Sequence, residues 1–238
     1  MKTGLSLIAL VLSLSGCVNF GQNANAPGVV YYVLNDAGHA AASAPAPTDA
    51  MKDSDPLRAK VPQGGMESYA PQGDSDSLRA EARERSYAPT LLVLDTTAGG
   101  FYDSDQLVFS RGAGTRGQYQ FARWTERPGK RFAELLRARL DRLGRYQVAP
   151  AGGSVRGDLM LDTRLVEFYH DAVREPGQVR LVLRAELVDL KQRRLLARRT
   201  FEQQVPLTTY DAAGAAQASS QAVGRALDDL SGWLATFE

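Results

Sequence analysis

Apolar and polar positions divide the chain into three parts. Leu5–Leu14 is apolar except for two serines. The long stretch over 35–88 is poor in large aliphatic side chains, with leucine or valine at only three positions. From residue 89 to the end, apolar side chains recur at the intervals of strands and helices. The pattern therefore predicts a folded C-terminal region that is separated from an apolar N-terminal run.

Two segments of that region have helical periodicity. The first is 128–144, where Pro128 suits the first turn and Gly144 suits the C-terminal cap. Its apolar face comprises Phe132, Leu135, Leu136, Leu140 and Leu143. The second begins at about Ala213, with Asp211 as candidate N-cap, and its apolar stripe runs to the end of the chain.

The remaining apolar segments have the composition of strands. They cover 91–96, 106–110, 119–124, 157–169, 178–190 and 194–205. The last three alternate and are separated by short turn segments, so they predict an antiparallel meander. A change of phase near Leu165-Val166 indicates a bulge. The expected fold is α+β, with a mostly antiparallel sheet, a strand–helix–meander–helix order and two amphipathic helices packed on the sheet.

The apolar N-terminal run has the properties of a secretory signal. Lys2 precedes it, and about ten residues are too few to span a bilayer as a helix. The run ends in Leu14, Ser15, Gly16 and Cys17, which resembles the bacterial lipobox. That resemblance implies a signal peptide over 1–16, cleavage before Cys17, and a diacylglyceryl and an N-acyl lipid on that cysteine. The alternative is an ordinary signal peptide that happens to contain a cysteine.

The residue after the cysteine bears on localisation. In lipoproteins of Gram-negative bacteria, which this segment resembles, an aspartate there retains the protein in the inner membrane. Val18 occupies this position. The resemblance therefore implies a lipid anchor in the outer membrane with the domain on the periplasmic face. Two or three acyl chains would hold it stably.

The rest of the chain divides by composition. Residues 17–30 read as the lipid anchor and a tether, and 31–34 as an N-terminal strand. Residues 35–88, rich in alanine and proline, predict a disordered insertion because they cannot bury enough apolar surface to offset the entropy of ordering. The folded domain covers 89–238.

Charge and cysteine content exclude several classes of function. The net charge of 238 residues is +1, which argues against a nucleic-acid partner. One cysteine forms no internal disulfide and no multi-cysteine metal site. Apart from the lipid, no cofactor is expected.

Three short motifs resemble catalytic or ligand sites, and each has a simpler reading. Residues 112–117 match the G-x-G-x-x-G pattern, but a strand follows where the phosphate site needs a helix, so a hairpin loop is expected. Residues 103–105 lack the glycine and distal glutamate of a calcium loop and predict a turn. Residues 167–171 alternate between the two faces of a strand, which disfavours a metal site. The sequence therefore predicts a protein that is not an enzyme.

Aromatic and arginine side chains mark a candidate interface, because tyrosine, tryptophan and arginine are enriched at interface hot spots. The candidates are Phe101, Tyr102, Arg111, Arg123, Trp124, Trp233 and Phe237. The alternative places the tryptophans in the core and the arginines in solvent. For Trp233 and Phe237, the alternatives are an interface between copies and the cap of a monomeric core.

The ordered set of segments resembles the ABC-type transport auxiliary lipoproteins. The lipobox is followed by Tyr31-Tyr32-Val33-Leu34, by the Phe-Tyr-Asp-Ser-Asp segment from Phe101, and by the Arg-Trp segment over 123–128. The amphipathic helix, Val-Glu-Phe at 166–168 and an alanine-rich terminal helix complete the set. The insertion over 35–88 departs from compact members.

This resemblance implies a non-enzymatic periplasmic domain at the outer membrane. It would dock beside an ABC permease and a mammalian-cell-entry (MCE) domain protein that carry lipids between membranes, and it would form a homo-oligomer. A lipid- or small-ligand-binding carrier is the alternative, and an anchored hydrolase has no support in the residues.

Overall fold

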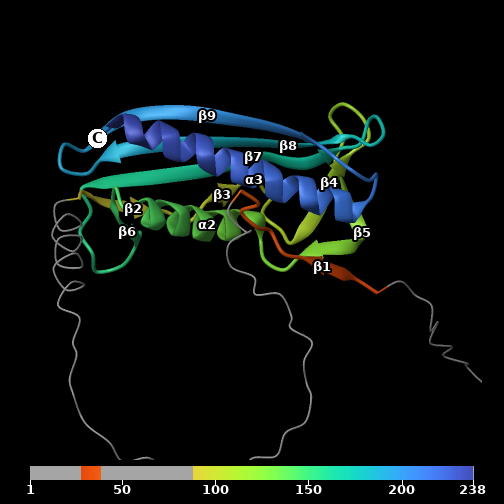
Figure 1. Cartoon of the computed structure of the whole chain (residues 1–238), viewed down its shortest axis with the longest axis horizontal. Helices are drawn as coiled ribbons and strands as arrows, with labels where there is room; N and C mark the ends of the chain where they lie inside the picture. Colours follow the sequence, from red (N-terminus) through yellow and green to blue (C-terminus); the bar gives the residue numbers. More distant parts are fainter. Residues whose placement is uncertain (1–27, 39–87, 238) are drawn as a thin grey trace, which may run out of the picture.

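One long strand, β7 (Leu159–Asp171), organises the sheet. In the computed structural model, which describes residues 28–38 and 88–237, one edge of β7 pairs with β8 (Gln178–Asp189). In turn, β8 pairs with β9 (Arg194–Pro206), and both pairings are antiparallel. These strands lie side by side in Figure 1 and confirm the predicted meander.

The other edge of β7 pairs with three short strands in succession: β2 (Thr90–Val93), β3 (Thr97–Ala98) and β4 (Gln106–Ser110). All three run parallel to β7. The sheet is completed by β5 (Gly117–Trp124), antiparallel to β4; β1 (Val30–Tyr32), parallel to β5; and β6 (Gln147–Pro150), parallel to β2.

The α+β class is confirmed, but the prediction of a mostly antiparallel sheet is wrong, because the sheet is mixed. The physical reason is the helix between the two halves of the sheet. Together β5 and α2 return the chain to the end of the sheet at which β2 begins, so β6 and β7 run parallel to the earlier strands β2, β3 and β4. The sequence analysis also missed β6, which is only four residues long.

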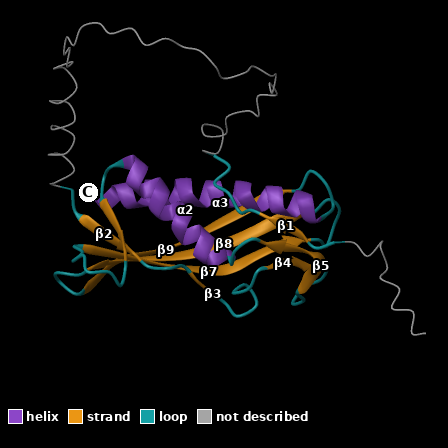
Figure 2. Ribbon diagram, turned by 90° about the horizontal axis from the view of Figure 1, so that it is seen from below, coloured by secondary structure: helices purple, strands orange, loops and turns teal. Residues whose placement is uncertain are grey.

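Both long helices, α2 (Pro128–Leu143) and α3 (Ala212–Leu234), lie on the same face of the sheet (Figure 2). The first packs on β6, β3 and β7, and the second packs on β8 and β9. A short 3₁₀ turn, Ala235–Phe237, follows the second. No helix of the described residues covers the opposite face of the meander, which we call the helix-free face.

The ends of the helices follow from their sequences. Pro128 occupies the first turn of α2, and Gly144 adopts a φ of 68°, a left-handed conformation that glycine takes without steric cost. At the start of α3, the Asp211 carboxylate accepts a hydrogen bond of 2.7 Å from the amide of Gly214. The predicted caps at both helices are confirmed.

The core lies between the helices and the sheet. Its largest fully buried side chains include Phe132, Leu136, Leu161, Leu181 and Leu227. The register of β7 shifts between Leu165 and Glu167, which confirms the predicted bulge. Because of the extra residue, Leu165 and Phe168 both face the core.

The segments that carry the anchor predictions lie outside the described residues. They are Leu14, Ser15, Gly16 and Cys17. Residues 39–87 of the predicted insertion also lie outside the described residues. Among the described residues, no helix combines the length and apolarity needed to cross a membrane.

Candidate functional site

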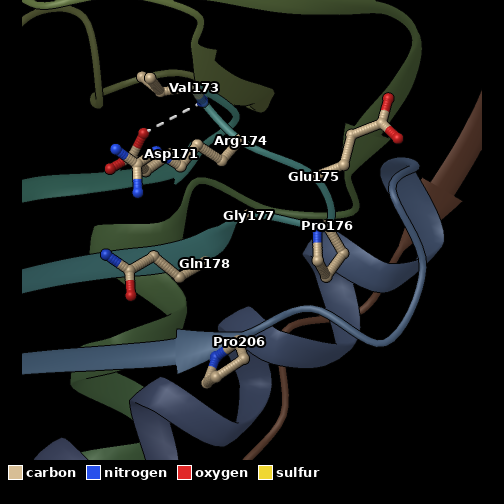
Figure 3. A pocket seen from close by; sticks show the side chains of 8 residues that line it. All are labelled: Asp171, Val173, Arg174, Glu175, Pro176, Gly177, Gln178 and Pro206. Carbon is tan, nitrogen blue, oxygen red and sulfur yellow. Dashed lines mark hydrogen bonds between the residues drawn. The ribbon is translucent and has the colours of Figure 1, made fainter.

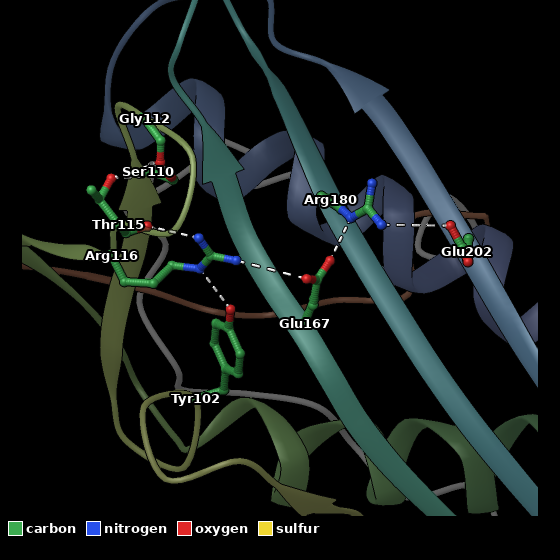
Figure 4. A network of polar contacts seen from close by, with 8 residues as sticks. All are labelled: Tyr102, Ser110, Gly112, Thr115, Arg116, Glu167, Arg180 and Glu202. Carbon is green, nitrogen blue, oxygen red and sulfur yellow. Dashed lines mark hydrogen bonds and ion pairs between the residues drawn. The ribbon is translucent and has the colours of Figure 1, made fainter.

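A network of polar side chains crosses the helix-free face of the sheet (Figure 4). Arg116, the residue before β5, donates a hydrogen bond of 2.8 Å from Nε to the hydroxyl of Tyr102 in the loop before β4. Its guanidinium carbon lies 3.8 Å from the centre of the Tyr169 ring on β7. Hydrogen bonding and cation–π contact thus hold this arginine against the sheet.

Glu167 on β7 connects this arginine to the meander. Its Oε1 lies 3.7 Å from Nη2 of Arg116, and its Oε2 accepts a hydrogen bond from Nε of Arg180 on β8. Nη2 of Arg180 lies 3.7 Å from Oε2 of Glu202 on β9. The hydrogen bond that Arg180 donates to Glu167 is the main cause that raises the pKa of Arg180 above its usual value. The network therefore fixes charged groups in defined positions across the β4–β9 part of the molecule.

The glycine-rich motif lies at the edge of this network. Residues 112–117 connect the antiparallel strands β4 and β5, and the hydroxyls of Ser110 and Thr115 each donate a hydrogen bond of 2.8 Å to the carbonyl of Gly112. The prediction of a hairpin loop is confirmed. No helix follows this loop, so it does not offer the helix N-terminus that a pyrophosphate site uses.

The other two candidate ligand motifs also have structural roles. Residues 103–105 form a turn, as predicted. On β7, Glu167 faces the network while His170 is buried on the opposite face. Within 28–38 and 88–237, no three metal-ligating side chains of the His, Cys, Asp and Glu types converge.

The buried histidine has a defined tautomer. Its Nε2 lies 3.2 Å from the carbonyl of Pro176, which only accepts, so Nε2 carries the proton. Nδ1 of His170 then accepts from the hydroxyl of Tyr119 at 2.7 Å. Burial lowers the pKa of His170, although the Pro176 hydrogen bond and Asp171 oppose the effect. Burial also raises the pKa of Tyr119 to about 12. This neutral pair closes the turn between β7 and β8.

That turn also borders a surface cavity of about 450 Å³ (Figure 3). Arg174, Glu175 and Pro176 line it from the turn, and Gln178 and Pro206 line it from β8 and β9. In Figure 3 the Glu175 carboxylate points away from the side chains of Asp171 and Arg174. We assign no catalytic chemistry to this cavity.

A second feature is the joint between the N-terminal segment and the helices. Residues 33–38, here called the strap, follow β1 and pass α2 and α3. The Asp36 carboxylate forms a buried ion pair with Arg139 of α2: Nε lies 3.0 Å from Oδ2, and Nη2 lies 2.6 and 2.7 Å from the two oxygens. The side chains of Arg139 and Asp36 are 4% and 7% exposed. Arg139 also contacts Asp228 of α3, so the joint ties the strap to both helices.

Further contacts position the strap along its length. Nε of Arg131 donates to the carbonyl of Leu34 at 3.0 Å, and the amide of Asn35 donates to the hydroxyl of Ser220 at 3.2 Å. A Cβ at Gly224 of α3 would lie 3.1 Å from the amide nitrogen of Gly38, so glycine permits this close approach. The first residues of the predicted insertion, 35–38, are therefore packed on the domain.

Sequence reasoning missed this joint, although one signal was present. Arg139 lies three residues after Leu136 and one before Leu140, which places a cation on the apolar face of the helix. An arginine there needs a buried acidic partner. The pattern does not say which acid supplies it, because Asp36 is 103 residues away in the sequence.

The candidate interface residues fall into two groups. Trp124 is buried and stacks on Phe168, with ring centres 6.0 Å apart. Trp233 is buried between Phe201 and Phe237, with ring centres 5.9 and 5.2 Å away. Within the described residues, both tryptophans pack in the core, which is the alternative to an interface position.

The remaining candidates lie near the surface. Phe101 is 44% exposed and packs edge-on against Tyr102, which belongs to the charged network. Arg111 is exposed, with its guanidinium 4.9 Å from the centre of the Phe109 ring. Arg123 is half-buried on β5. The structure thus joins Phe101 and Tyr102 to the helix-free face, whereas sequence reasoning missed Arg116, Glu167 and Arg180 as their companions.

Comparison with solved structures supports the fold. The structure is similar to that of protein XCC0632 from Xanthomonas campestris, with a TM-score of 0.58, 23% identity, and coverage of 62% of this chain and 84% of that chain. It is also similar to a solved structure described as an uncharacterized protein, with a TM-score of 0.53, 13% identity, and coverage of 61% and 92%. No curated protein matches the chain.

A family model establishes the relationship directly. Residues 75–231 match the model of the ABC-type transport auxiliary lipoprotein component, which is more than half of the chain. The match includes the whole charged network and both long helices apart from the last residues of α3. The chain therefore belongs to the ABC-type transport auxiliary lipoprotein family.

Proposed function

We propose that the chain is an outer-membrane-anchored periplasmic lipoprotein that docks the periplasmic part of an ABC/MCE lipid-transport system. The observation that carries this proposal is the family match over residues 75–231. The lipobox sequence that ends at Cys17 supplies the anchor, with its acyl chains attached to that thiol. The domain supplies the docking surface and no catalytic step.

The helix-free face suits docking better than catalysis. Glu167, Arg180 and Glu202 on this face are paired with one another across β7, β8 and β9, so they are held in place before a partner arrives. Fixed, complementary charge contributes specificity and association rate at protein interfaces. Phe101 adds an exposed aromatic side chain beside the network.

Copurification tests the docking role. The full-length lipoprotein carrying an affinity tag should retain the MCE-domain protein encoded with the same transport system. Absence of that protein under mild detergent conditions would contradict the proposal. Organic extraction of the chain purified without its covalent lipid anchor, here called the lipid-free chain, provides the second measurement. A docking protein should release no lipid, whereas a stoichiometric amount of lipid would support the carrier function.

The anchor is tested by Cys17→Ala, which removes the thiol that receives the lipid. We expect an uncleaved or soluble periplasmic product. Ser15→Ala is the matched control, because alanine is also small and leaves the thiol in place. If Cys17→Ala fractionates with the outer membrane like the unmodified protein, lipidation is not the anchor.

We also propose that the protein assembles into a homo-oligomer. Within the described part of the chain, β9 pairs with β8 alone and β1 pairs with β5 alone, so each strand has an open edge. Many copies of one weak docking site would raise avidity for a symmetric partner. Light scattering on the lipid-free chain at tens of micromolar tests this assembly, and a strictly monomeric mass would contradict it.

A further inference from the structure

Two arginines stand opposite each other in the middle of the helix-free face. Arg164 of β7 and Arg184 of β8 are partners in the antiparallel register, so their side chains leave the same face of the sheet. Both are exposed. Directly opposed residues have Cβ atoms about 4.5–5.5 Å apart, close enough for both guanidinium groups to reach one ligand. We call these two residues the arginine pair.

The arginine pair differs from the other charged groups of this face. Neither member forms an ion pair or a hydrogen bond with any residue of 28–38 or 88–237. Like charges that face each other across two strands destabilise a sheet. Among the described residues, these two adjacent exposed cations therefore have no acid bound to them in an ion pair or hydrogen bond.

The nearest acids pair with other arginines or form no ion pair with these two. Oε1 of Glu186, two residues along β8, accepts a hydrogen bond of 2.7 Å from Nε of Arg198. Glu167 is shared between two other arginines of the network. Burial, followed by the charge of Glu186, raises the pKa of Asp162 despite the opposing effect of Arg164. The arginine pair is therefore open to direct contact with a carboxylate of another molecule.

We propose that the arginine pair receives an acidic side chain of the protein partner and is the specificity-determining point of the docking face. This inference rests on the proposed docking function and names the chemistry of the partner. Two guanidinium groups present planar, fixed donors that match carboxylate geometry.

The charges around the arginine pair favour a protein partner over a lipid surface. Asp162 and Glu186 flank it on one side along the strands, and Glu167 and Glu202 flank it on the other. A bilayer with anionic headgroups presents a continuous negative layer, which these four acids would repel. A protein surface can place one carboxylate over the arginine pair and basic groups over the flanking acids, so the pattern fits discrete charges.

The first experiment uses a defined probe. A synthetic peptide with two adjacent glutamates flanked by lysines is titrated into the lipid-free chain and followed by NMR. The test variant is Arg164→Gln/Arg184→Gln. The matched control is Arg194→Gln/Arg225→Gln, which removes two exposed arginines from β9 and α3. We expect the peptide to shift signals of β7 and β8, with about tenfold weaker binding in the test variant and unchanged binding in the control.

Three outcomes overturn the proposal: no binding by the unmodified chain, equal weakening by both double variants, or stronger binding to phosphatidylglycerol vesicles than to the peptide. A misfolded variant is not expected, because removing opposed like charges should leave the urea midpoint unchanged or higher. The second arm measures retention of the MCE-domain protein by the same variants. If the unmodified lipoprotein and both double variants retain the MCE-domain protein equally, the arginine pair is not the docking site, but the docking function stands. If the unmodified lipoprotein retains no MCE-domain protein, the docking function is wrong even if the peptide binds.

Discussion

The ion pair between Asp36 and Arg139 should make the largest single polar contribution to the stability of the N-terminal segment. The perturbation we consider is Asp36→Ala, which removes the acid and leaves Arg139 in place. The arginine side chain is 4% exposed, so it cannot regain water without moving the strap or the helix. Its other acidic partner, Asp228, has a side chain that is 56% exposed and is a weaker substitute.

The magnitude follows from these exposures. Removing one member of a buried ion pair costs about 3–5 kcal/mol, because the remaining charge is left uncompensated. Asp228 still contacts Arg139, so we expect the lower end of that range, about 3 kcal/mol. For a domain of this size, such a loss lowers Tm by about 6–12 °C.

Urea unfolding of the lipid-free chain provides the assay. The single variants Asp36→Ala and Arg139→Met, together with the double variant, form a cycle that isolates the interaction of the pair. Arg139→Met alone leaves Asp36 with Arg142, whose Nη2 lies 3.7 Å away and whose side chain is 54% exposed. The double variant should be more stable than Asp36→Ala alone, because methionine packs in the site without a charge.

Two results would refute this reasoning. A loss below about 1 kcal/mol for Asp36→Ala would mean that water reaches Arg139 and the pair is not buried in solution. Additive losses in the cycle would mean that the two side chains do not interact energetically. Hydrogen exchange gives an independent measure, since Asp36→Ala should lower amide protection at residues 33–38 more than in the centre of β7.

Further predictions concern the cap, the buried histidine and the insertion. Asp211→Ala should cost about 1 kcal/mol in urea unfolding by removing the cap on Gly214, whereas Asp211→Ser should retain most of it, and equal losses would contradict the capping role. Burial lowers the pKa of His170 in the folded protein, so the unfolded chain takes up a proton at a higher pH than the folded chain does. The free energy of unfolding should therefore fall as the pH drops below about 6.5, by at most about 1.4 kcal/mol per pH unit. In Tm measurements from pH 7.5 to 5.5, His170→Gln should reduce this dependence on pH. Deleting about forty residues within 39–87 should change Tm little, and a fall of several degrees would show that this segment packs on the domain.

Local signals in the sequence were sufficient for most of the elements. The apolar stripe of α2 and its Pro128 and Gly144 ends are set within sixteen or so residues, and the structure confirms them. The alternation along β7 and β8 predicted which residues face the helices, including the change of phase at the bulge, whereas on β9 it was wrong for Leu195, which is exposed beyond a second register shift. Such patterns arise because helices and strands have fixed periods, whatever the rest of the chain does.

The direction of the short strands could not be predicted in the same way. Periodicity does not distinguish a parallel neighbour from an antiparallel one, and β3 has only two residues. Their pairing with β7 depends on the crossover through α2, which is a property of the whole fold. The strap is a similar case, because the partner of Arg139 lies beyond a segment of about fifty residues with little apolar content.

The candidate interface residues also divide into those that the local sequence describes and those that depend on the whole fold. Aromatic residues that sequence reasoning assigned to an interface, Trp124 and Trp233, pack inside the protomer because large apolar rings gain most by burial. The arginine pair gave no local signal, since Arg164 and Arg184 become neighbours only through strand register. Charged side chains that become neighbours through strand register can be identified only when the strand pairing is known.

The two functional features lie on opposite sides of one sheet. The strap contacts the helix layer through Arg131, Arg139 and Ser220, whereas the arginine pair and the charged network lie on the face without helices. A closely packed core lies between the helix layer and the sheet. The buried ion pair of Asp36 contacts none of the residues of the proposed docking face, so we expect Asp36→Ala to lower stability without removing a docking contact.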